Sequence, residues 1–239
     1  MAVPRGYFGE TGAGVHAARR TVHTVLGLEG NGGAPGLSIA FGRAAERVGV
    51  ERLSIIYFSG TGHTTKLAEA VNQGSASVEG VKTNLIAING DDIAKGRYAN
   101  EAVFAQLDAS DAIIFGSPTY MGGPAAQFKA FADATGGRWY QSAWRDKVAA
   151  GFTVSSGPSG DKLSTLHYFF TLAMQQGMIW VGFPETPMND QGINRLSSYS
   201  GVMAQAGQEP TDVAPNVADK LTGELLGRRV ASMAAKLKK

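Results

Sequence analysis

Apolar residues change their spacing along this chain in a way that predicts strands and helices in alternation. Leu53–Phe58 form a nearly continuous apolar run, as expected for a strand that helices cover on both faces. Leu67, Ala68 and Val71 then fall on one face of a helix. The stretch Leu53–Gln73 is therefore predicted to be a buried strand, a short loop and a helix packed on the sheet.

The same plan of strand, loop and helix recurs toward the C-terminus. Further strands are predicted at Val81–Ile88, Ala112–Phe115, Val148–Val154 and Met178–Val181. Further helices are predicted from about Phe128 to Gly136, over Leu163–Gln176, and from near Pro215 onward. Strands that alternate with helices need right-handed crossovers, so the sheet is predicted to be mainly parallel. The predicted fold class is α/β, a doubly wound five-stranded sheet with helices on both faces.

Two features near the C-terminus carry separate predictions. Phe183–Gln208 contains several prolines and glycines and is predicted to be a long loop that covers a functional face or forms a subunit contact. The final helix is predicted to bury one apolar stripe in the core. The stripe consists of Val217, Leu221, Leu225, Val230, Met233 and Leu237.

The first fifty of the 239 residues differ in character from the rest. Glycines interrupt every apolar run there, and no periodicity develops before Leu37. We predict that residues 1–50 form a disordered or loosely packed extension and that residues 51–239 form one domain. A genuine extension and a translation start placed too far upstream explain this composition equally well.

Composition narrows the classes of function. The chain has no cysteine, which excludes disulfides, thiolate catalysis and cysteine-bound metal sites, and which suits a cytoplasmic protein. Its net charge is +2 and it has no run of basic residues, so no nucleic-acid partner is predicted. No apolar stretch reaches the roughly 18 residues of a membrane-spanning helix, so no membrane span is predicted. No metal site is predicted either.

The loop after the first strand has the composition of a phosphate site. Ser59–Thr65 offers two glycines that let backbone amides approach an anion, hydroxyl groups that can donate to it, and a helix N-terminus. A Walker loop would need a lysine where His63 follows Gly62, and a dinucleotide loop would need a glycine at Thr65. A monophosphate is therefore the predicted ligand. The alternative is that Gly60 and Gly62 only make a tight turn.

Two further polar loops follow the third and fourth predicted strands. The second loop, Ser117–Pro124, could lie along a flat ring system through Tyr120 and Met121. The third loop, Ser155–Gly160, could close over the ring's other edge with amides and hydroxyls. Ligands bind beyond the carboxyl ends of parallel strands, so all three loops are expected to converge on one crevice. An ordinary turn and a flexible connection are the respective alternatives for these two loops.

None of the three loops carries a recognisable set of catalytic side chains. They contain no G-x-S-x-G, no H-E-x-x-H and no pair of carboxylates. His63 is the one histidine among them, and we interpret it as a packing residue or a donor to backbone, with a proton-transfer role as the alternative. An enzyme with these loops would rely on a bound cofactor for its chemistry.

Several segments resemble one known family. They are FGSPTYMGGPAAQFKAF (residues 115–131), TGGRW (135–139), QQGMIWVG (175–182) and INRLSSYSGVMAQ (193–205). The S-x-T-G-x-T run of the first loop resembles the FMN phosphate loop of the flavodoxin-like family. Over about residues 52–206, the chain resembles the flavodoxin-like NAD(P)H:quinone oxidoreductases of the WrbA type and, more broadly, the NAD(P)H-dependent FMN reductases.

The resemblance implies a sheet with strand order 2-1-3-4-5, bound FMN, NAD(P)H as electron donor and a quinone or similar small acceptor. It also implies a homo-oligomer, a dimer or a tetramer, because this family completes its sites across subunits. By position, the FMN phosphate is assigned to Ser59, Gly60, Thr61, Gly62, His63 and Thr64. The isoalloxazine is assigned to Thr119, Tyr120 and Met121, with Pro118 and Gly122 beside them as further cofactor-binding residues. Its pyrimidine side is assigned to Ser155, Ser156, Gly157, Pro158 and Gly160. The substrate cavity is assigned to Trp139 and Gln176.

The chain departs from the WrbA pattern at three places. The pattern has an aromatic residue at Thr61, Arg-Phe at Tyr120-Met121, and histidine at Gln176. These groups are associated with nicotinamide or quinone binding, so FMN binding carries over better than the reaction. Two alternatives remain open: an electron-carrying flavodoxin, and a flavin-free scaffold or regulator. The slightly basic charge disfavours the carrier, because such carriers are strongly acidic.

Overall fold

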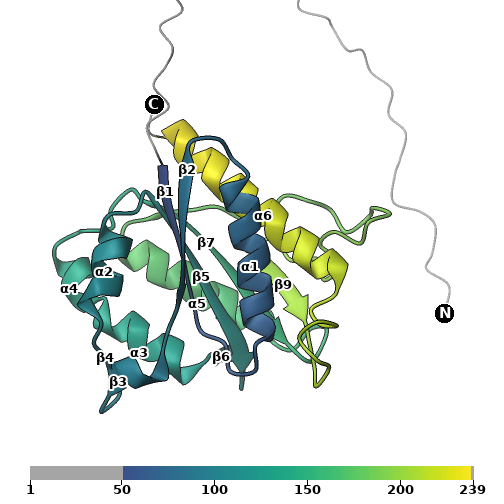
Figure 1. The fold of residues 1–239 in the computed structure, drawn as a ribbon, viewed down its shortest axis with the longest axis horizontal. Coiled ribbons are helices and arrows are strands. Elements are labelled where there is room, and N and C mark those ends of the chain that lie inside the picture. Colours follow the sequence, from purple (N-terminus) through teal and green to yellow (C-terminus); the bar gives the residue numbers. More distant parts are fainter. Residues whose placement is uncertain (1–50, 238–239) are drawn as a thin grey trace, which may run out of the picture. The chain divides into compact units, whose positions relative to one another are not determined.

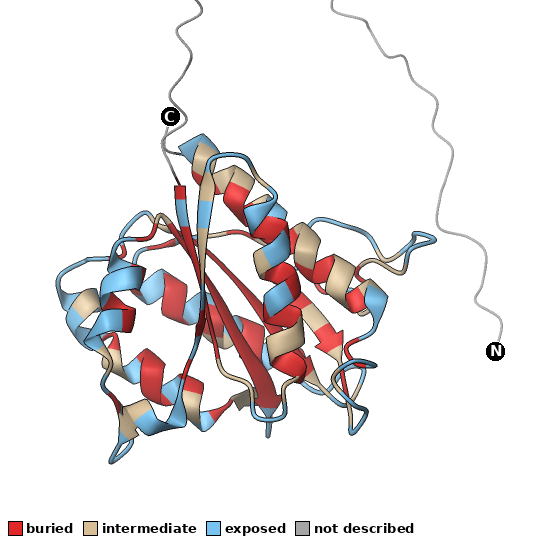
Figure 2. Cartoon of the chain, in the orientation of Figure 1, coloured by how far each residue is buried: buried red, intermediate tan, exposed pale blue. Residues whose placement is uncertain are grey.

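The computed structural model describes residues 51–237, which form a three-layer α/β domain (Figure 1). Residues 1–50, for which the sequence predicts an extension, lie outside the described residues. Buried residues concentrate in the strands and on the inner sides of the helices (Figure 2). No helix of the described part has the length and apolar character needed to cross a membrane.

The middle layer is a parallel sheet. Its strands are β1 (Glu51–Tyr57), β2 (Val81–Ala87), β5 (Ala112–Tyr120), β7 (Val148–Ser155) and β8 (Ile179–Trp180), in the spatial order β2-β1-β5-β7-β8. Ile55 of β1 is in register with Leu85 on one side and Ile114 on the other. Counted by these main strands, the order is 2-1-3-4-5, so the predicted doubly wound fold is confirmed.

The outer position beside β7 is filled by two separate strands. The first half of β7 pairs with β8, and its second half pairs with β9 (Val202–Gln205). The prediction that all of Phe183–Gln208 is loop is therefore wrong for β9. Val202 and Ala204 are fully buried, but a strand of four residues between serine and glycine neighbours has too short an alternation to stand out.

Helices cover both faces of the sheet (Figure 1). On one face, α1 (His63–Ala76) and α6 (Val217–Leu237) share a core with the strands. On the other face, the core includes side chains of α2 (Glu101–Asp108), α3 (Ala126–Ala134) and α5 (Lys162–Gln175). The apolar pattern did not predict α2, the short α4 (Gly136–Tyr140), the 3-10 helix η1 (Gly90–Asp92), or the hairpin of β3 (Ile93–Ala94) and β4 (Arg97–Tyr98).

Small residues, and not the predicted apolar stripe, form most of the buried face of α6. Val217 at the start of the predicted stripe is 78% exposed. Gly223 and Gly227 are buried because α1 lies too close for side chains there. A Cβ atom on Gly227 would lie 2.0 Å from the carbonyl oxygen of Val71. The predicted stripe followed large apolar residues, whereas close helix contact selects glycine and alanine.

The second predicted loop is partly strand. β5 continues through Ser117 and Pro118 to Tyr120, and it forms a hairpin with β6 (Gly123–Pro124). Met121 and Gly122 connect the two strands with φ angles of 48° and 77°. Two consecutive positive φ angles are typical of the tight turns that join antiparallel strands. The prediction of a loop over Ser117–Pro124 therefore holds only for this turn.

Candidate functional site

The first loop joins the end of β1 to the start of α1 and is closed by its own serine. The Ser59 hydroxyl oxygen accepts hydrogen bonds from the amides of Gly62 at 3.0 Å and Thr65 at 3.3 Å. Gly62 has a φ angle of 92°, and a Cβ atom there would lie 2.9 Å from the Thr211 methyl group. Glycine is therefore required at this turn on two grounds, conformation and space.

Backbone donors remain available in this loop. Among residues 51–237, the amides of Thr61, His63 and Thr64 donate to no protein acceptor. These amides lie at the N-terminus of α1, where the helix dipole also favours negative charge. A phosphate group is an acceptor with a negative charge, so the loop fits the terminal phosphate of FMN.

His63 joins this loop to a distant part of the chain. Its side chain is buried, with 7% of its surface exposed. Its Nε2 lies 2.7 Å from the backbone oxygen of Glu209, and its Nδ1 lies 2.9 Å from the Thr61 hydroxyl. A carbonyl oxygen only accepts, so Nε2 donates, and Nδ1 of a neutral ring accepts from Thr61. The histidine thus positions Thr61 and fixes segment 209–211 against the loop.

The second loop lies against the first. A Cβ atom on Gly60 would come within 2.4 Å of the Tyr120 hydroxyl oxygen, so this end of the tyrosine covers the first loop. Met121 is fully exposed at the tip of the hairpin. The Ser164 hydroxyl at the start of α5 donates to the carbonyl oxygen of Gly122 at 2.5 Å. The hairpin tip is therefore tethered to α5.

Beneath the second loop is a chain of three buried hydroxyl groups. The Thr119 hydroxyl lies 2.8 Å from that of Thr153 in β7 and 2.7 Å from that of Thr165 in α5. Nearby, the Ser117 hydroxyl accepts from the amide of Ala125 at 2.9 Å. These bonds fix the end of β5 to its neighbours, so the second loop is held in place from below.

The third loop is held from behind by two long side chains. The Lys162 ammonium donates to the Ser155 hydroxyl at 2.9 Å and to the carbonyl oxygen of Gly157 at 2.5 Å. The Gln205 amide donates to the carbonyl oxygen of Ser156 at 3.0 Å. Because these oxygens are engaged inside the protein, the loop is left with free donors toward solvent.

Glycine shapes the same loop, and Lys162 lies in an unusual environment. A Cβ atom on Gly160 would lie 2.2 Å from the Ser155 hydroxyl, while Pro158 is exposed on the outer side. Burial lowers the pKa of Lys162 to about 8, an effect that the Asp219 carboxylate opposes and the Arg195 guanidinium reinforces.

A cavity of about 790 Å³ opens beside the third loop. Pro158 and Ser159 of the loop, His167 of α5 and Arg195 of the segment before β9 all contribute to its lining. Arg195 donates two hydrogen bonds of 2.7 Å to the buried carboxylate of Asp219. The cavity is larger than three others of the described domain, whose volumes are about 290, 280 and 260 Å³, and it adjoins the third loop.

Trp139 and Gln176 line one cavity, which lies away from the three loops. Both line a cavity of about 280 Å³ with Tyr168 and Leu172. Gln176 follows the last residue of α5, whereas the third loop precedes its first residue. A helix of 14 residues is roughly 20 Å long, so one chain does not bring this cavity to the loops.

Only one of the two polar side-chain atoms of Gln176 forms a hydrogen bond. Its side-chain nitrogen donates to the Thr135 hydroxyl at 2.8 Å, and its side-chain oxygen is buried without a hydrogen-bond partner. Only 4% of the residue is exposed. An unpaired buried oxygen is costly, so a donor arriving in this cavity would relieve it.

Sequence reasoning missed the residues that support the loops from below and behind. They are Thr153, Thr165, Lys162, Gln205 and Glu209. A lone lysine or glutamine at the end of an element is usually solvated, so no local pattern distinguishes Lys162 or Gln205. Glu209 contributes only its backbone oxygen to His63, and no side-chain signal could reveal that.

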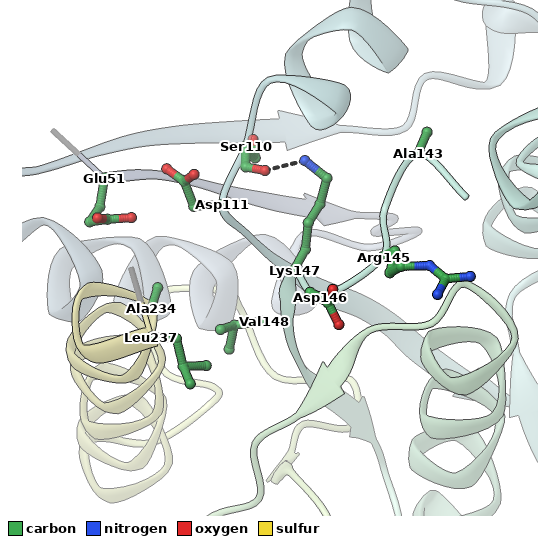
Figure 3. Close-up of a pocket in the computed structure, with 10 residues that line it drawn as sticks. All are labelled: Glu51, Ser110, Asp111, Ala143, Arg145, Asp146, Lys147, Val148, Ala234 and Leu237. Carbon is green, nitrogen blue, oxygen red and sulfur yellow. Dashed lines mark hydrogen bonds between the residues drawn. The ribbon is translucent and has the colours of Figure 1, made fainter. Parts of the chain in front are cut away.

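A further pocket, of about 290 Å³, lies at the amino ends of β1, β5 and β7, opposite to the ends that carry the three loops (Figure 3). The Lys147 ammonium donates there to the backbone oxygens of Ser110 and, at 2.8 Å, Asp108. Burial lowers the pKa of Lys147, while Asp111 and Asp108 oppose that shift. None of the three loops reaches this pocket. Among residues 51–237, no cluster of histidine and carboxylate side chains could hold a metal ion.

The order of the strands and the loops at their carboxyl ends define a flavodoxin-like protein. Residues 54–189 match the family described as NADPH-dependent FMN reductase. The chain is 37% identical over 188 residues to flavodoxin FldP of Pseudomonas aeruginosa, covering 77% of this chain and 96% of FldP. It is 34% identical over 198 residues to an NAD(P)H dehydrogenase (quinone) of Geobacter sulfurreducens, covering 77% and 97% respectively.

A solved structure agrees with these relatives. The crystal structure of a flavodoxin, WrbA-like protein from Agrobacterium tumefaciens is 40% identical, with a TM-score of 0.60, and covers 78% of this chain and 98% of that one. The chain belongs to the NADPH-dependent FMN reductase family, which confirms the predicted resemblance. It is an oxidoreductase with FMN as cofactor and NAD(P)H as electron donor.

Proposed function

We propose that the protein is an NAD(P)H:quinone oxidoreductase whose three loops hold FMN at one edge of the sheet. The observation that carries this proposal is the set of free amides of Thr61, His63 and Thr64, in a loop whose Gly60 lies against the hydroxyl end of Tyr120 from the second loop. A quinone is the proposed acceptor because several relatives at 31–34% identity are named NAD(P)H dehydrogenase (quinone).

Each loop has a distinct role in this proposal. Ser59–Thr64 bind the phosphate through amides, and Pro118–Gly122 lie along the isoalloxazine. Ser155–Gly160 approach its pyrimidine side with the amides that Lys162 and Gln205 leave free. The chain therefore contributes binding and orientation rather than an acid–base pair.

The reaction transfers two electrons. A hydride leaves the nicotinamide, and the quinone gains that hydride's two electrons with two protons, one of them from solvent. Bound FMN supplies the carrier between the two substrates. Among the described residues, the hydrogen-bonded hydroxyls of Thr119, Thr153 and Thr165 support the second loop, which is the loop proposed to lie along the ring.

The proposed active form is a homo-oligomer, a dimer or a tetramer. Trp139 and Gln176 line a cavity at the far end of α5, so a neighbouring subunit would have to bring them to the loops. In this form, Trp139→Ala should lower quinone turnover and leave the FMN content unchanged. Tyr140→Ala is the matched control, because Tyr140 is the adjacent residue and is 84% exposed outside the cavity. The purified enzyme is tested for activity, and its mass in solution is measured by light scattering. An active enzyme with the mass of a single chain would contradict the oligomer.

An electron-carrying flavodoxin is the second candidate, since FldP is 37% identical to this chain. Purified protein should first be tested for bound FMN by its visible absorption. NADH or NADPH is then added with a benzoquinone, and nicotinamide oxidation is followed. Steady oxidation supports the oxidoreductase, whereas bound FMN without turnover would favour the carrier. Protein that neither retains nor binds FMN would exclude both and leave the flavin-free scaffold or regulator.

A further inference from the structure

Lys162 is a buried cation in a place that disfavours cations. It is the first residue of α5 and has no exposed surface. The N-terminus of a helix repels positive charge, and removing a charge from water is costly. A lysine that served only to start the helix would turn outward. Its burial therefore points to a role in the loop above it.

The charge of Lys162 is not neutralised by direct contact. Within the described part of the chain it forms no ion pair, and its two hydrogen bonds go to neutral oxygens of Ser155 and Gly157. Asp219 acts on it at longer range. The Asp219 carboxylate is already engaged by Arg195, with two bonds of 2.7 Å, and by the amide of Gln205 at 2.8 Å. Positive charge therefore remains beneath the third loop.

The loop above this charge presents donors. The amides of Ser156, Gly157 and Ser159 have no protein acceptor among residues 51–237. The loop's oxygens at Ser155, Ser156 and Gly157 are bound from behind. A surface of free amides over a buried ammonium is electropositive, so it favours whichever state of a ligand carries more negative charge.

We propose that Lys162 makes the third loop bind reduced FMN in preference to oxidised FMN. The proposal rests on the proposed function, in which this loop faces the pyrimidine side of the flavin. Two-electron reduction adds negative charge on that side of the ring. Lys162 would act through the loop without touching the reacting atoms, so it is a positioning residue that raises the reduction potential of the bound flavin.

The environment of the ammonium agrees with this role. Burial lowers the pKa of Lys162 to about 8, with Asp219 opposing the shift and Arg195 reinforcing it. The amine is therefore still protonated at neutral pH and loses its charge within an accessible range. Negative charge above the loop would make it hold the proton more tightly.

The test compares Lys162→Met with the wild-type holoenzyme. The dissociation constant of oxidised FMN is measured by fluorescence quenching on apoprotein, and the two-electron potential by equilibrium titration. In the variant, binding of reduced FMN should weaken about tenfold more than binding of oxidised FMN, as for one charge pair at an effective dielectric constant of about 20. That ratio equals a fall of about 30 mV in potential. Lys129→Met removes an exposed lysine of α3 and should leave the potential unchanged.

Lys162→Arg separates charge from structure and serves if the methionine variant does not fold. Arginine keeps its charge at all accessible pH values. The reduction potential of the Lys162→Arg variant should match that of wild type at pH 7. Above the pH range in which Lys162 titrates, the variant's potential should be the higher one, because only the lysine then loses its charge. Equal weakening of both redox states in Lys162→Met, or coinciding pH profiles for Lys162→Arg and wild type, would overturn this inference alone. Wild-type protein that binds no FMN would overturn the proposed function together with it.

Discussion

Removing Arg195 should destabilise the domain strongly, because it would leave a buried carboxylate without its cation. The Asp219 side chain is 2% exposed, and the Arg195 side chain is 31% exposed. Two hydrogen bonds of 2.7 Å join them in a forked geometry, and the backbone amide of Gln205 donates a third hydrogen bond to Asp219 at 2.8 Å. Arg195→Met keeps much of the apolar stem and deletes both charged bonds.

The structure sets the expected magnitude. Breaking a buried ion pair by removing one partner costs about 3–5 kcal/mol, and partial exposure of Arg195 reduces this to about 2–3 kcal/mol. A domain of this size loses about 2–4 °C in melting temperature per kcal/mol, so a fall of roughly 5–10 °C is expected. Urea unfolding and calorimetry measure the two quantities. The double variant Arg195→Met/Asp219→Leu should recover most of the loss, since it no longer buries the Asp219 carboxylate without its cation.

Lys66→Met provides the matched control. Lys66 forms a 2.9 Å ion pair with Glu69, and the side chains are 39% and 47% exposed. Loss of such a surface pair should change stability by less than about 1 kcal/mol. The reasoning is refuted if Arg195→Met is no less stable than Lys66→Met, or if the double variant is less stable than the single one.

Three further outcomes are expected. Gly62→Ala should weaken FMN binding and lower the free energy of unfolding by about 1–3 kcal/mol, because φ is 92° and the new Cβ atom meets Thr211. Titration of apoprotein with FMN measures the loss of binding, and urea unfolding measures the loss of stability. Gly227→Leu should prevent α6 from packing on α1 and lower the free energy of unfolding by more than about 3 kcal/mol. The loss is measured as a lower urea midpoint or as the loss of cooperative unfolding. Leu237→Ala, at the exposed end of α6, should change the stability little. The stability of wild type relative to Lys162→Met should increase as pH rises from about 8 to 10.5, because the folded state has the lower pKa and the unfolded state therefore binds more protons in that range; a flat difference in unfolding free energy would contradict it.

The sequence predicted those parts of the fold whose pattern is local. The spacing of apolar residues alone predicts the inner face of α1 and buried strand segments such as Ile113–Phe115 of β5. β9 and the buried face of α6 do not. β9 forms because the second half of β7 needs a neighbour, and Gly223 and Gly227 are buried because α1 approaches closely. Both depend on contacts between segments far apart in the chain.

In the candidate site too, only the parts with a local sequence pattern could be predicted. The three loops could be found because glycines and hydroxyl residues follow apolar strands, and the structure brings them to one edge of the sheet. Their supports could not be found. Lys162 reads as an ordinary surface lysine, and the bond from His63 to residue 209 joins positions 146 residues apart. The distance between Trp139 and the loops follows from the direction of α5, which a list of motifs does not contain.

The divided outer strand has a consequence for how this protein can associate. β8 has two residues and β9 has four, and the chain leaves the sheet between them. Another chain that tried to extend the sheet on this side would meet two short rows of backbone groups instead of a continuous template. Short, interrupted edges resist aggregation by strand addition. Strand addition is therefore disfavoured on this side, and a long hydrophobic strand engineered to bridge β8 and β9 would remove that protection.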